Sequence, residues 1–184
     1  LQFSWKLNEL SPDKFVVVDT GLANKIVKEA LNENSIVELS NYSSFFSEVP
    51  YGTNSRIDFL LEFNDKPKCY LEVKSVTLSR RKKIAEFPDS VTSRGAKHLI
   101  ELEKMVKSGF RAVMLFLICR NDCEVFDISD DLDPFYAKCF SKASEAGVEV
   151  LCYDTVINKE IIKIGRRIPL CDALINRMSF NDAG

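Results

Sequence analysis

Two neighbouring stretches of this chain read as the strands of one β-hairpin. Residues 56–61 and 70–74 each alternate between apolar and polar positions, and the polar connection at 64–68 contains a proline. Strand side chains alternate with a period of two, so Glu72 and Lys74 share one face of the second strand. The same alternation predicts that the apolar residues of the first strand share a face: Ile57, Phe59 and Leu61.

The first strand of the hairpin contains a second carboxylate. A turn centred near residue 65 or 66 places Asp58 opposite Glu72 or Lys74, on the same face of the sheet. Cross-strand neighbours lie roughly 4.5–5.5 Å apart at Cβ, so two carboxylates and an amine would be adjacent. This spacing is compatible with a metal site that prefers oxygen ligands, and equally with a surface hairpin that carries mixed charges.

A metal site at this position would suit phosphodiester hydrolysis. Mg²⁺ (or Mn²⁺) prefers octahedral oxygen ligands and keeps several waters, so one or two carboxylates suffice on the protein side. The predicted ligands are Asp58, Glu72 and the backbone carbonyl of Val73, and Lys74 would orient or deprotonate the attacking water. Glu29, on the edge of the apolar face of a preceding helix, is a fourth candidate.

The remaining pattern predicts a mixed sheet flanked by helices, an α/β sandwich. Residues 35–50 read as loop and irregular structure, a strand between 50 and 57 stays open, and the second hairpin strand is expected to run on to residue 78. Asp19 or Thr20 is the expected cap of the first helix. The other predicted elements are strands at 3–10, 14–19, 112–119 and 148–153 and helices at 22–32, 91–108 and 133–146.

Composition narrows the class of protein. The 184 residues are 46% hydrophobic, enough for one core, and no apolar run approaches the roughly 18–20 residues that span a bilayer. Six scattered cysteines without a Cys-x-x-Cys pair predict free thiols in a reducing cytoplasm. The net charge of −2 argues against coating nucleic acid by bulk electrostatics. The basic run Arg80–Lys83, next to the Glu-x-Lys strand, is either a solvated loop or a phosphate contact.

From about residue 17 to 169 the chain resembles the sugar fermentation stimulation protein family. The resemblance implies a restriction-endonuclease-like, PD-(D/E)xK core with Asp58, Glu72 and Lys74 in the motif positions, although Ile57 replaces the motif's proline. It also implies an N-terminal OB-fold domain, of which residues 1–19 would be a remnant, before a nuclease-like domain at 20–170 and a tail at 171–184. The segments that carry the resemblance are 52–59, 70–78, 87–99, 109–112, 133–134 and 146–150.

The resemblance implies double- or single-stranded DNA as the partner and leaves two functions in competition. One is a metal-dependent DNA endonuclease, and the other is a DNA-binding regulator of sugar (maltose) metabolism genes that keeps the fold without its chemistry. A membrane role is not expected, and a homodimer is left open. His98 is assigned to helix packing. The predicted DNA contacts are Arg56, Arg80, Arg81, Lys82, Lys83, Arg94 and Lys97.

Overall fold

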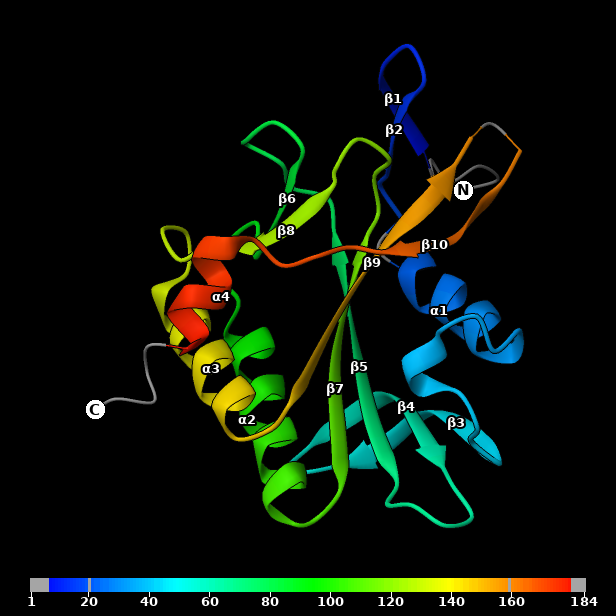
Figure 1. Ribbon diagram of the computed structural model, residues 1–184, viewed down its shortest axis with the longest axis vertical. Coiled ribbons are helices and arrows are strands. Elements are labelled where there is room, and N and C mark those ends of the chain that lie inside the picture. The colour runs from blue at the N-terminus through cyan, green and yellow to red at the C-terminus, as the bar shows by residue number, and fades with distance from the viewer. Residues whose placement is uncertain (1–6, 20, 159, 180–184) are drawn as a thin grey trace.

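A six-stranded mixed sheet forms the centre of the computed structural model, which describes residues 7–19, 21–158 and 160–179 (Figure 1). The strand order is β10-β9-β7-β5-β4-β3, with β5, β7 and β9 parallel and the other neighbours antiparallel. The mixed sheet flanked by helices agrees with the predicted α/β class. The strands are β3 (Ser44–Tyr51), β4 (Ser55–Glu62), β5 (Cys69–Val76), β7 (Arg111–Ile118), β9 (Glu149–Ile157) and β10 (Ile162–Arg167).

Helices cover both faces of this sheet. Helix α1 (Leu22–Asn32) packs on one face, and α2 (Ser93–Lys107) and α3 (Pro134–Glu145) pack on the other, as Figure 1 shows. The central strand β7 alternates between the two cores: Met114 and Phe116 face α2 and α3, whereas Val113 and Leu115 face α1. Two-sided burial explains its continuous apolar sequence.

Side chains cap the starts of two helices. Thr92 caps α2 by accepting the N–H of Gly95 at 3.0 Å, and Asp133 caps α3 before a proline at the first helical position. The cap predicted for α1 differs. Gly21 occupies the N-cap position without a side-chain bond, Asp19 instead accepts the N–H of Gly21, and Thr20 lies outside the described residues.

Several elements are not evident in the sequence pattern. The segment predicted as irregular contains a short 3₁₀ turn, Val37–Leu39, and the edge strand β3, whose mostly exposed side chains give no apolar alternation. Strand β5 ends at Val76 and does not reach residue 78. Strands β6 (Ile84–Phe87) and β8 (Val125–Ile128) form a separate parallel pair, and α4 (Asp172–Ser179) contacts α3. Strand β10 was likewise not predicted.

The N-terminal hairpin joins the same core. Strands β1 (Leu7–Ser11) and β2 (Lys14–Val17) pair as predicted, whereas residues 3–6 of the first predicted strand lie outside the described residues. The N–H of Val17 donates to Cys119 O at 2.9 Å, and Phe15 packs among the residues that contact α1. The packing therefore does not divide at residue 19. No helix in the described part of the chain is long and apolar enough to cross a membrane.

Candidate active site

Strands β4 and β5 separate where the predicted acidic residues lie. Their pairing ends at Phe59–Leu71, and one further step in that register puts Asp58 opposite Glu72. The Asp58 carboxylate accepts the N–H of Val73 at 2.8 Å, replacing the lost strand partner. It also accepts a hydrogen bond from Asn24 of α1 at 2.7 Å. Asp58 is thus fixed in the gap between the two strands.

The same separation corrects the predicted alternation of β4. Phe59 and Leu61 pack toward α1, but Ile57 packs in the opposite core, with α2 and α3. The simple period of two fails between residues 57 and 59 because β4 leaves its partner there. Asp58 lies at this irregularity, which directs its carboxylate toward α1 and the main chain of β5.

Glu72 is the most deeply buried acid of the site, at 2% exposed. Its Oε1 accepts a hydrogen bond from Lys74 Nζ at 2.8 Å and is also hydrogen-bonded to His98 Nδ1. Lys74 Nζ lies 3.1 Å from the same ring nitrogen of His98. Its Oε2 is buried and has no hydrogen-bond partner among the described residues. Lys74 and His98 therefore hold Oε1, whereas Oε2 has no partner among the described residues.

The two carboxylates differ in how readily they ionise. Burial raises the pKa of Glu72, but hydrogen bonds and charge from His98 and Lys74 outweigh it, so the pKa lies below its usual range. Burial and then the negative charge of Glu72 raise the pKa of Asp58, against the hydrogen bonds from Val73 and Asn24. Both carboxylates would be ionised together most easily with a cation between them.

These residues fit a divalent cation with few protein ligands. Within the described ranges no three His, Cys, Asp or Glu side chains converge on one metal position. The available ligands would instead be two carboxylates and the main-chain oxygen of Val73. The N–H of Val73 points toward Asp58, and in a β-strand the carbonyl of a residue points to the same side as its N–H. The unpartnered oxygen of Glu72 supplies the structural reason to expect a cation there.

A groove of about 510 Å³ begins beside this site. It is lined by Arg56 from β4 and by Arg94, Lys97 and His98 from α2, together with Glu48, Pro50, Asn54 and Ser55. His98 belongs to both places, since it lines the groove and contacts Glu72. Three of the predicted DNA contacts, Arg56, Arg94 and Lys97, therefore come together next to the carboxylates.

The basic run after β5 has a different environment from the predicted one. Arg80 and Arg81 both form ion pairs with Glu86, which is 1% exposed, and they reach Asp131 and Asp127 respectively. Lys83 pairs with Glu124 at 2.7 Å, and Lys82 is exposed. The two arginine side chains connect the loop before β6 to β6, to β8 and to the loop after β8, and these carboxylates offset their charge.

Helix α1 contributes a residue to the site that the sequence did not predict. Glu29 is exposed on α1, and Asn24 is the α1 residue that donates a hydrogen bond to Asp58. An amide beside the apolar stripe of α1 was the available signal for Asn24. His98, assigned to packing, is buried as expected and in addition binds Glu72.

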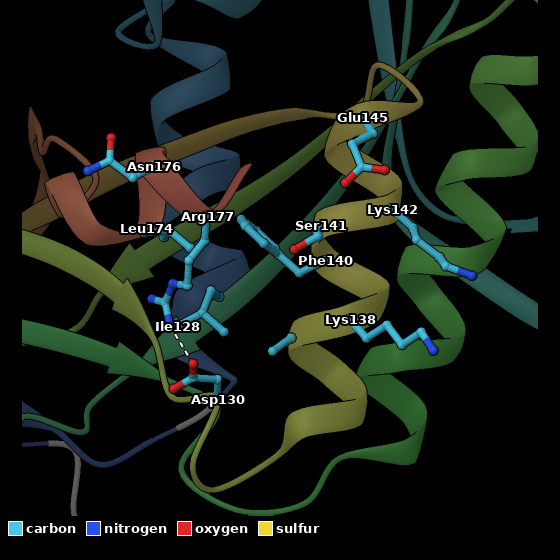
Figure 2. Close-up of a pocket in the computed structure, with 11 residues that line it drawn as sticks. Ile128, Asp130, Lys138, Phe140, Ser141, Lys142, Glu145, Leu174, Asn176 and Arg177 are labelled. Atoms are coloured by element: carbon cyan, nitrogen blue, oxygen red, sulfur yellow. Dashed lines mark hydrogen bonds and ion pairs between the residues drawn. The ribbon is translucent and has the colours of Figure 1, made fainter. Parts of the chain in front are cut away.

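A larger cavity, of about 710 Å³, lies elsewhere, between α3 and α4 (Figure 2). Phe140 and Leu174 line it, and Arg177 points toward Asp130, with which it forms an ion pair at 2.5 Å. Of its two acidic residues, Asp130 is paired with Arg177 and the other is Glu145, and none of the residues at the β4–β5 gap lines the cavity. The candidate site therefore lies at the β4–β5 gap, which His98 connects to the smaller groove.

Comparison with known proteins identifies the family of this chain. The family model described as "Sugar fermentation stimulation protein RE domain" matches residues 21–161. Sugar fermentation stimulation protein homologues from Dinoroseobacter shibae and a Ruegeria species are 49% and 50% identical over 92% of this chain and 70% and 73% of their own lengths.

A solved structure extends the comparison to the fold. The structure of Pyrococcus furiosus SfsA in complex with Ca²⁺ superposes with a TM-score of 0.79 at 27% identity, covering 86% of this chain and 68% of that one. The core is therefore the restriction-endonuclease-like α/β fold that the sequence predicted. The chain belongs to the sugar fermentation stimulation protein family.

Proposed function

We propose that this protein binds DNA and hydrolyses its phosphodiester bonds with Mg²⁺ or Mn²⁺ at Asp58, Glu72 and Lys74. One observation carries the proposal. Glu72 is buried with an unpartnered oxygen beside a second carboxylate, Asp58, in a gap between two strands. Lys74 and His98 already stabilise Oε1, but a buried carboxylate oxygen without a partner is costly, and a cation at Oε2 would complete it. The fold that surrounds the pair is nuclease-like, and a relative from P. furiosus was solved with Ca²⁺.

The protein groups have separable tasks. Asp58, Glu72 and the Val73 carbonyl would hold the metal, which when bound supplies Lewis acidity and neutralises phosphate charge. Lys74, with its ammonium fixed on Glu72 Oε1, orients the attacking water and offers positive charge to the scissile phosphate. His98 is a positioning residue, because it holds Glu72 from the α2 side and leaves Oε2 available.

Nicking of supercoiled plasmid DNA tests the catalytic part. The wild type is expected to nick in Mg²⁺ or Mn²⁺ and to stop in EDTA. Asp58→Asn and Lys74→Ala are expected to reduce the rate on the order of 100-fold or more, and His98→Ala about 10- to 100-fold. Asp65→Asn and Lys66→Ala, on the exposed hairpin turn, are matched controls expected to leave the rate unchanged.

The outcomes separate the two candidate functions. Equal nicking by the wild type, Asp58→Asn and Lys74→Ala would exclude this centre. DNA retention in gel shifts without cleavage in any divalent metal would favour the alternative, a non-catalytic regulator of sugar (maltose) metabolism genes. Circular dichroism and thermal melts of each variant show whether a lost rate is merely a lost fold.

A further inference from the structure

The arginines of this chain divide into two groups. Seven of the nine form ion pairs with carboxylates, and the two without such a pair among the described residues, Arg56 and Arg94, line the same groove. Arg94 is exposed, and Arg56 donates only to the main-chain oxygen of Glu48, at 2.8 Å. The chain has 27 acidic residues, yet the two arginines without a carboxylate partner among the described residues lie in the same groove. The paired arginines are Arg80, Arg81, Arg111, Arg120, Arg166, Arg167 and Arg177.

Helix α2 adds positive potential at the same point. Arg94 lies in its first turn, which contains no acidic residue. A cation there opposes the helix dipole, whereas an anion is favoured. The combination of an unpaired arginine and an uncompensated helix start is unfavourable in the free protein and becomes favourable when a negatively charged group occupies the groove.

The walls of the groove are fixed to each other. Lys97 Nζ donates to Thr53 O at 2.7 Å, and Glu101 Oε1 accepts the N–H of Thr53 at 3.1 Å. These bonds tie the turn between β3 and β4 to α2, so Arg56 and Arg94 keep a defined separation across the groove. A preorganised pair of guanidinium groups suits phosphate oxygens, which they bind with two parallel hydrogen bonds each.

We propose that this groove binds a DNA strand through a phosphate next to the one that is attacked. The proposal rests on the function proposed above, since His98 connects the groove to Glu72 and so places the groove directly beside the cleavage centre. Arg56 and Arg94 hold the strand, Lys97 fixes the wall through Thr53 and Glu101, and the carboxylates act on the neighbouring phosphate. Glu48, the acid in the lining, opposes phosphate binding and limits its strength.

Fluorescence anisotropy of a labelled DNA oligonucleotide in EDTA tests the groove without cleavage. The double variant Arg56→Gln/Arg94→Gln should lower the slope of log K against log salt by about 1.4–1.8, which corresponds to roughly 25- to 60-fold weaker binding at 0.1 M salt. Arg166→Gln/Arg167→Gln removes the same charge from ion-paired positions and should leave the slope unchanged. Glu48→Gln should strengthen binding.

Nicking in Mg²⁺ then separates this proposal from the catalytic one. The groove variant should raise the DNA concentration needed for half-maximal rate and keep the maximal rate. An unchanged salt slope and unchanged nicking would overturn the groove while leaving the cleavage centre standing. A reduced slope with no nicking by the wild type would leave the groove standing and overturn cleavage. A slope reduced only in Arg166→Gln/Arg167→Gln would place the strand elsewhere and overturn the groove.

Discussion

Gly52 is the position at which the structure makes its sharpest quantitative prediction. Its φ is +54°, in the left-handed region, and a Cβ added there would lie 2.9 Å from the carboxylate of Glu101. Gly52→Ala therefore incurs about 1–2 kcal/mol of backbone strain. It also displaces a carboxylate that accepts the N–H of Thr53, and such a bond to a charged group is worth about 1.5–3 kcal/mol. The expected loss of unfolding free energy is about 2.5–5 kcal/mol.

Gly109 provides the matched control. Its φ is +85°, and nothing lies within 4 Å of an added Cβ, so Gly109→Ala should cost only the strain, about 1–2 kcal/mol. Urea unfolding gives both free energies, and in thermal melts each kcal/mol should lower Tm by about 2–4 °C in a chain of this size. Gly52→Ala should in addition weaken DNA binding, because the groove loses its fixed wall. Equal costs for the two variants would refute the inference that Glu101 anchors the β3–β4 turn.

Three further predictions follow from buried groups. Asp58→Asn should abolish cleavage but raise Tm, because burial and the neighbouring Glu72 raise the pKa of Asp58 and so make its ionised form unfavourable in the folded protein. The difference in Tm from the wild type should shrink as the pH falls through that pKa, because the wild-type carboxyl group then becomes protonated. Glu86→Gln should cost about 2–4 kcal/mol, because Arg80 loses a buried partner. Burial raises the pKa of Glu86, but Arg80 outweighs it and lowers the pKa, so this contribution is complete above the unfolded pKa and is lost as pH falls through the folded one. Native-state alkylation should modify Cys171 first, because the other five cysteines are buried and burial raises the pKa of Cys69, for example, to about 12.

The sequence predicts best what depends on local pattern. The antiparallel pairing of the strands that carry Asp58 and Glu72 follows from their sequence pattern and a polar connection, although the alternation predicted for β4 fails at Ile57, and the helix predicted at 133–146 begins at Pro134. Strand β3 was missed because an edge strand with exposed side chains carries no alternation. Strands β6 and β8 were missed because each is four residues long and is defined by a partner about forty residues away.

The site shows the same limit at the level of single residues. His98 looks like any packed histidine until tertiary structure brings it onto Glu72, and Asn24 becomes visible only through Asp58. Arg80 was assigned to DNA because its run is basic, but Glu86 and Asp131 neutralise it. Charge along a sequence does not show which charges are paired, and pairing decides which cations remain for a ligand.

The most direct test of the central claim is a crystal soaked with Mn²⁺ and measured at the manganese absorption edge. An anomalous peak is expected within coordination distance of Asp58 and Glu72, on the side of the unpartnered Glu72 oxygen, and it should be lost in Glu72→Gln. A well-ordered site without a peak, or a peak that survives Glu72→Gln unchanged, would contradict it.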